Sequence, residues 1–78
     1  MIHSEQIRAA RALVGWRQDD LAKASKVGLA TLQRVEQQSG LAKANTATLF
    51  RLQKALEERG VRFLGEDETG GVGVRLVR

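Results

Sequence analysis

Apolar residues recur at helical spacing close to the beginning of the chain. The segment from Ser4 to Val14 contains neither glycine nor proline, and its arginines fall on a different face from its apolar residues. These apolar residues are Ile7, Ala10, Leu13 and Val14. His3 or Ser4 is a candidate N-cap, and Gly15 follows where a helix commonly ends. The pattern predicts a first helix with these apolar residues on its buried face.

Two shorter helical patterns follow, at residues 18–25 and 29–37. Lys26, Val27 and Gly28 separate them. The apolar positions are Leu21 and Ala22 in the first pattern and Leu32 and Val35 in the second. Helices this short cannot bury their apolar residues alone. We therefore expect the two helices to cross at a steep angle and to pack through Ala22 and Val27.

A longer helix is predicted from Thr46 to Arg59, after a polar loop at residues 38–44. Asn45 is its expected N-cap, and Gly60 is expected to end it in the left-handed conformation. Its buried stripe is predicted to contain Leu49, Leu52 and Leu56.

The period of the apolar residues changes from helical to alternating after residue 60. Val61 and Phe63 alternate with other residues, as do Val72, Val74 and Leu76 in a second run. A polar, glycine-rich segment at residues 65–71 separates the two runs, and the pattern predicts a β-hairpin. Because a lone hairpin is marginally stable, we expect its apolar face to pack partly on the helix at residues 46–59.

These elements predict a mainly α-helical fold of about four helices followed by a C-terminal β-hairpin. We expect residues 1–60 to form the helical part and residues 61–78 to form a hairpin within the same compact unit. A chain of 78 residues is one domain with a modest core. Its hydrophobic share of 42% excludes a wholly disordered chain.

Composition excludes several further classes of protein. The absence of cysteine excludes a disulfide framework and a thiolate zinc site. No apolar run exceeds three residues, so we expect neither a transmembrane helix nor a signal-peptide core. These features predict a soluble, cytoplasmic protein that makes no contact with a membrane.

The positive charge lies in the helical part of the chain. Residues 1–60 contain ten Lys and Arg against six Asp and Glu, whereas residues 61–78 contain three of each kind. The whole net charge of +4 therefore comes from the predicted helices and their loops. An excess of this size permits binding to a polyanion such as nucleic acid.

Candidate catalytic residues are few. His3 is the only histidine, and Asp19 and Asp20 begin a predicted helix, where carboxylates favour the positive end of the helix dipole. The glycines between residues 70 and 73 lack the strand-loop-helix context of a phosphate-binding loop. We therefore expect no enzyme activity, no catalytic residues, no cofactor and no metal.

The segment from Arg17 to Glu36 carries the most specific pattern in the chain. It resembles the helix-turn-helix of the Cro/repressor-like family, also called the XRE family, of bacterial and phage transcription regulators. The positions that fit the family pattern are Gln18, Leu21, Ala22, Val27, Thr31, Leu32, Arg34, Val35 and Glu36. The resemblance extends over residues 2–60. It implies a lambda-repressor-like fold and binding to double-stranded DNA.

Three features depart from the family pattern. Lys26 stands in the turn where the family usually has glycine, so it is expected to adopt a positive φ or a slightly altered turn. Gly28 stands where the family usually has a Ser or Thr N-cap, and it caps less well. The predicted hairpin replaces the fifth helix that is common in the family.

The resemblance implies that the third helix, at about residues 29–37, enters the major groove. The residues expected to face outward are Leu29, Ala30, Gln33 and Arg34. Arg34 suits guanine and Gln33 suits adenine, while Leu29 or Ala30 suits the methyl group of thymine. Two alternatives to base reading are left. Gln33 and Arg34 can be ordinary solvated surface residues, and Leu29 can be a partly buried packing residue.

Other residues are candidates for contacts with DNA phosphates. Gln18 is the foremost, because the resemblance places it there and the start of a helix favours an anion. The remaining candidates are Arg17, Lys26, Thr31, Gln37 and Lys43. For these flanking residues, a role in solubility alone stays open as an alternative, and for Thr31 a role in supporting the helix stays open.

We expect Glu36 to pair with an arginine of the first helix. We expect Trp16 to pack between the first two helices rather than to stack on a base.

Two functions are consistent with this sequence. The first is a transcription regulator that binds operator DNA as a homodimer on a palindromic site, with the hairpin as a dimerisation element. The second is an antitoxin-like module that binds a toxin partner and autoregulates its operon. A hairpin that only covers the core stays an alternative to the dimerisation element.

Overall fold

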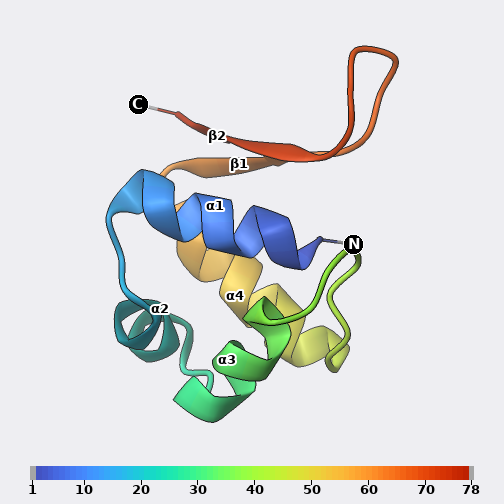
Figure 1. The fold of residues 1–78 in the computed structure, drawn as a ribbon. Coiled ribbons are helices and arrows are strands. Elements are labelled where there is room, and N and C mark those ends of the chain that lie inside the picture. The colour runs from blue at the N-terminus through green and yellow to red at the C-terminus, as the bar shows by residue number, and fades with distance from the viewer. Residues whose placement is uncertain (1, 78) are drawn as a thin grey trace.

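Four helices and an antiparallel β-hairpin make up the computed structural model, which describes residues 2–77 (Figure 1). The elements are α1 (Ser4–Val14), α2 (Gln18–Ser25), α3 (Leu29–Glu36), α4 (Thr46–Glu58), β1 (Val61–Leu64) and β2 (Gly73–Leu76). The predicted mainly α-helical fold with a C-terminal hairpin is confirmed. Both α3 and α4 end one residue earlier than the sequence pattern predicts.

Local sequence determines where the helices begin and end. Asn45 Oδ1 accepts the N–H of Thr48 at 2.8 Å, which is the expected N-cap bond of α4. Gly15 after α1 and Gly60 after α4 adopt left-handed φ angles of 71° and 97°. At Gly60 a Cβ atom would also lie 2.7 Å from the carbonyl oxygen of Val77, so the passage from α4 into β1 requires glycine.

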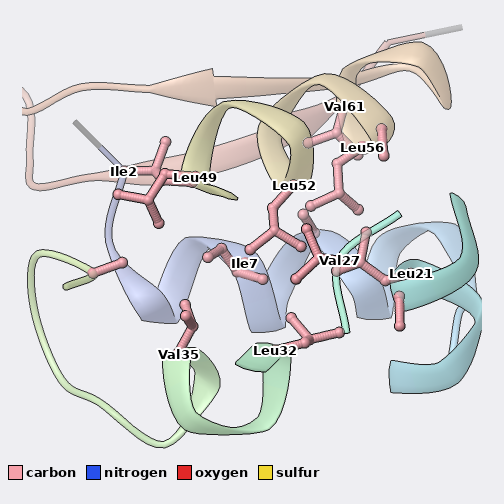
Figure 2. Close-up of a cluster of buried hydrophobic side chains, with 14 residues drawn as sticks. Ile2, Ile7, Leu21, Val27, Leu32, Val35, Leu49, Leu52, Leu56 and Val61 are labelled. Carbon is pink, nitrogen blue, oxygen red and sulfur yellow. The ribbon is translucent and has the colours of Figure 1, made fainter. Parts of the chain in front are cut away.

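The hydrophobic core lies where the four helices meet (Figure 2). Its largest fully buried apolar side chains are Ile7, Leu21, Leu32, Leu52, Leu56 and Val35. Ala22 and Val27, the predicted packing residues of α2 and the following turn, are both buried. Leu13 corrects the prediction for α1, because 41% of its surface is exposed. It lies at the margin of the hairpin, where it borders a hollow with Leu76 and Val77.

The hairpin lies across α1, on the side of that helix away from α3 (Figure 1). The expected contact with α4 is present and is made by β1. The larger contact, however, is with α1, which packs against both strands and chiefly against β2. The sequence pattern shows that the hairpin has an apolar face, but it does not indicate which helix that face covers.

Gln6 fastens the hairpin to α1. Its side-chain amide donates hydrogen bonds to the carbonyl oxygens of Leu64 at 2.9 Å and Gly73 at 2.8 Å. Its Oε1 accepts the backbone N–H of His3, the N-cap residue of α1, at 2.8 Å. Gln6 is only 4% exposed, so these bonds are largely shielded from water.

The register of the hairpin determines which backbone groups remain free at its edges. Val61 pairs with Leu76, and the adjacent pair is joined by a bond from the Val77 N–H to the Gly60 carbonyl at 2.6 Å. Bonded and non-bonded pairs alternate along an antiparallel ladder. The N–H and C=O groups of Val74 and Leu76 therefore point away from β1, along the free edge of β2.

Candidate nucleic-acid interface

A tight turn joins α2 to α3 and determines how α3 is presented. Val27 is buried in the core, and its N–H donates to the Ala22 carbonyl at 3.2 Å. Lys26 adopts a φ of 60°, the left-handed conformation that this position was expected to require. Gly28 is the N-cap residue of α3 and contributes no side-chain bond. Backbone geometry and one buried side chain thus connect the two helices.

The two faces of α3 differ sharply in exposure. Leu32 and Val35 point into the core and are almost completely buried (Figure 2). The four proposed base-reading residues, Leu29, Ala30, Gln33 and Arg34, are all exposed on the other face. Leu29 is 41% exposed, so part of its surface is open to a ligand, while the covered remainder is also consistent with the partly buried packing role that the sequence left open. The helix therefore presents two apolar and two polar side chains to the solvent.

Arg34 is held at the surface by a neighbour on the same helix. Its Nη2 donates to the hydroxyl oxygen of Thr31, one helical turn earlier, at 3.1 Å. Thr31 itself is half-buried. No ion pair formed within residues 2–77 involves Arg34, so its charge remains available to a ligand.

A buried carboxylate anchors the end of α3. Glu36 is 4% exposed, and its two carboxylate oxygens accept hydrogen bonds from Arg11 Nε and Nη2, each at 2.8 Å. The expected pairing of Glu36 with an arginine of the first helix is confirmed. Arg8 of the same helix donates to the backbone carbonyls of Glu36 and Gln38, so α1 also holds the chain where α3 ends.

Gln18 connects the start of α2 to this cluster. Its Nε2 donates to Glu36 Oε1 at 3.1 Å, a contact that the sequence did not indicate. One hydrogen of the amide is thereby engaged, and the second hydrogen remains for a ligand at the half-buried surface of this residue. Gln18 therefore lies between the buried anchor of α3 and the solvent, at the first position of α2.

Arg17, in contrast, is surrounded by carboxylates. Its side chain is 81% exposed and forms ion pairs with Asp19 at 3.5 Å and Asp20 at 3.9 Å. Asp20 also accepts the backbone N–H of Arg17 at 2.9 Å, which caps α2. Exposed pairs of this kind are weak and exchange readily with other partners. Arg17 would have to leave them to contact a phosphate.

A hollow of about 460 Å³ lies between α3 and the start of α4. Its polar lining residues are Thr31, Arg34, Gln38, Lys43, Asn45 and Thr48. The sequence pointed to three of these residues and missed Gln38, Asn45 and Thr48. Gln38 belongs to the polar loop before α4 and Asn45 and Thr48 to the start of that helix, and only the structure brings these segments beside α3.

The loop that borders this hollow is closed by its own side chains. Gln38 Oε1 accepts the Lys43 N–H at 2.6 Å, and Gln38 Nε2 donates to the Lys43 carbonyl at 3.0 Å. Glu5 accepts the N–H of Gly40 at 2.9 Å, and bonds from its own N–H and that of Gly40 hold the pKa of this carboxyl below its usual value. Lys43 is thus supported beside α3, while Gln37 is exposed where α3 ends.

Trp16, predicted to pack between the first two helices, packs against the core and is half-buried. The guanidinium of Arg59 lies 5.4 Å from the centre of its ring, in a cation–π arrangement. Trp16 therefore helps to join the region between α1 and α2 to the residue that follows α4.

Residues 2–77 contain neither a metal-binding cluster nor a membrane-spanning helix. Within this part of the chain, no group of three or more His, Asp or Glu side chains is placed to hold a metal ion. None of the helices in the same range is long and apolar enough to cross a membrane.

Comparison with known proteins agrees with this geometry. A family model described as helix-turn-helix matches residues 7–62, which include all four helices from Ile7 onwards and the first two residues of β1. No curated protein and no solved structure gives a significant match to the chain. The matched segment includes the whole α2–turn–α3 unit and every proposed DNA-contacting residue.

Proposed function

The chain belongs to the helix-turn-helix family of Cro/repressor-like DNA-binding transcription regulators, and we propose that it reads operator DNA with α3 in the major groove. The observation that carries this proposal is the division of α3 into a buried and an exposed face. Leu32 and Val35 fix the helix to the core, which leaves the opposite face free to approach base edges.

The chemistry of the exposed face supports reading of specific bases. Arg34 has the donors for two hydrogen bonds to guanine, and Gln33 has the donor and acceptor that adenine requires. Leu29 and Ala30, at the start of α3, are suited to the methyl group of thymine. A contact with this methyl group would give the exposed surface of Leu29 a role.

Residues on both sides of α3 are suited to contact phosphates. Gln18 has a free amide hydrogen at the start of α2, and Lys26 lies in the turn just before α3. Thr31 and Lys43 line the hollow between α3 and α4. Contacts on both sides would position the helix in the groove without reading sequence themselves.

The proposal can be tested by selecting a preferred duplex from a random pool and measuring binding by fluorescence anisotropy. Replacing Arg34 or Gln33 by alanine should reduce discrimination between the selected and a random duplex by about 1–3 kcal/mol each. Arg62→Ala, an exposed change on the hairpin, is the matched control and should leave discrimination intact. If both α3 variants discriminate as well as the unmodified protein, α3 does not read the bases.

We further propose that the protein acts as a homodimer joined along the free edge of β2. Among residues 2–77, the N–H and C=O groups of Val74 and Leu76 point outward at this edge without a partner in β1, and a second copy would satisfy them. Leu13 and Val77, 41% and 43% exposed, lie beside this edge and would be covered in such a pair. A two-fold axis here would supply the symmetry that a palindromic operator requires.

A toxin partner remains a second candidate function, favoured by a separate observation. Phe50 on α4 is 63% exposed and Leu41 is 54% exposed, and each offers apolar surface that a protein partner could cover. Co-expression with the product of a neighbouring open reading frame would test it. A stable complex that is lost in the Phe50→Lys variant would support an antitoxin-like role.

A further inference from the structure

The side-chain bond between Arg34 and Thr31 has a consequence for specificity. Within residues 2–77, Arg34 is the one proposed base-reading residue whose side chain forms a hydrogen bond. A free arginine side chain samples many rotamers, and this freedom is lost when it binds a base. A bond that already exists in the unbound protein reduces the loss.

Thr31 is well suited to hold a neighbour in place. Its β-branched side chain has few rotamers in a helix, and it is half-buried at the wall of the hollow between α3 and α4. The bond to its hydroxyl uses one hydrogen of Arg34 Nη2. Four of the five guanidinium hydrogens remain, which is sufficient for a bidentate contact with guanine.

We infer that Thr31 is a positioning residue that orients Arg34 and thereby determines how strongly one base pair is recognised. This inference rests on the proposed function. It replaces the phosphate contact offered above for Thr31, a residue for which the sequence also left a supporting role open. The two roles are separable, because a phosphate ligand affects all sequences equally, whereas an orienting residue affects one base pair.

Two substitutions distinguish these roles. Thr31→Val removes the hydroxyl but keeps the branched shape, and Thr31→Ser keeps the hydroxyl. Binding is measured on the selected duplex and on duplexes changed at the base pair to which Arg34→Ala is sensitive. Thr31→Val should lose about three- to tenfold of the discrimination at that base pair. Its discrimination at other positions and its salt dependence should be unchanged, and Thr31→Ser should behave like the unmodified protein.

A double-substitution experiment isolates the coupling. In the Arg34→Ala background, Thr31→Val should cause no further loss at that base pair, because there is no guanidinium left to orient. Thermal unfolding of each variant shows whether α3 is still folded. If Thr31→Val is unfolded, Thr31→Ala and Thr31→Ser are compared in the same way.

Three results would overturn the inference while leaving the proposed function in place. They are unchanged discrimination in Thr31→Val, uniform weakening on all duplexes, and an equal loss in the Arg34→Ala background. A different result, the absence of any sequence preference in the unmodified protein, would overturn the proposed function itself.

Discussion

A lysine in the left-handed region occupies the turn between α2 and α3. Lys26 is the one non-glycine residue with a positive φ within residues 2–77, and the family it resembles usually has glycine there. The conformation costs an L-residue with a Cβ atom about 1 kcal/mol. Its charge lies three residues before the first residue of α3, beside the proposed DNA surface. The proposed phosphate contact, which glycine cannot make, would account for the use of lysine here.

Lys26→Gly should therefore change stability and binding in opposite directions. Relief of the left-handed conformation should raise the unfolding temperature by about 4–8 °C. Loss of the charge should weaken binding to all duplexes and reduce the slope of log affinity against log salt by about 1. Calorimetry and anisotropy at several salt concentrations measure the two effects.

A second variant, Lys26→Asn, separates the effect of the lost charge on binding from the effect of the backbone conformation. Lys26→Asn tolerates the left-handed conformation and should weaken DNA binding as much as Lys26→Gly does. If either neutral variant retains the affinity and the salt slope of the unmodified protein, Lys26 is not a phosphate ligand.

At the scale of the elements, the attachment of the hairpin depends on one amide. Gln6 supplies hydrogen-bond donors to carbonyls of both strands and is shielded from water. Gln6→Ala should leave the Leu64 and Gly73 carbonyls without these donors, which costs about 1–3 kcal/mol in a buried setting. Hydrogen exchange should accelerate in β1 and β2 more than in α4.

Gln53→Ala is the matched control for this prediction. Gln53 is half-buried on α4, and within residues 2–77 its amide forms one hydrogen bond, to Glu57 one turn along the same helix, at 3.0 Å. Its loss should leave exchange in the strands unchanged. Equal exchange rates in the strands of Gln6→Ala and the unmodified protein would show that apolar packing alone holds the hairpin.

The boundaries of the elements could be predicted from sequence because local chemistry determines them. Asn45 caps α4, and glycines end α1 and α4, as predicted. The alternating apolar residues after Gly60 identify the strands. The exposure of Leu13 could not be predicted, because it depends on where the hairpin crosses α1 rather than on the period of that helix.

In the candidate site too, local sequence predicts some features and tertiary packing determines the others. The outward face of α3 follows from the burial of Leu32 and Val35, which the helical period predicts. The bond from Gln18 to Glu36 joins residues 18 positions apart, on helices whose relative placement no local pattern specifies. The hollow beside α3 likewise requires the loop before α4 to fold back, so it is a property of the tertiary structure.

At the scale of the whole molecule, the proposed dimer makes a prediction about an exposed residue. Leu13→Lys should not disturb the monomer, because 41% of Leu13 is already in contact with solvent. In the dimer it would place a charge beside the β2 edge and oppose association. Sedimentation should show a monomer at concentrations where the unmodified protein is a dimer. Affinity should fall for a two-site operator but not for a single half-site.

Phe50→Lys controls for the loss of any exposed apolar side chain. Phe50 is 63% exposed on α4, and it does not border the β2 edge. This variant should dimerise normally. An unmodified protein that remains monomeric while it occupies its operator would contradict the proposed dimer and favour a hairpin that only covers the core.

The division of α3 into a buried and an exposed face also bears on how such a protein changes during evolution. The residues that hold α3 to the core and those proposed to read DNA are different residues on opposite sides of one helix. Substitutions at positions 29, 30 and 33 encounter little packing constraint, since surface changes usually alter stability only slightly. A lineage could therefore acquire a new operator in a few steps without passing through an unstable intermediate. Position 34 would be slower to diverge, because a new side chain there would also have to suit Thr31.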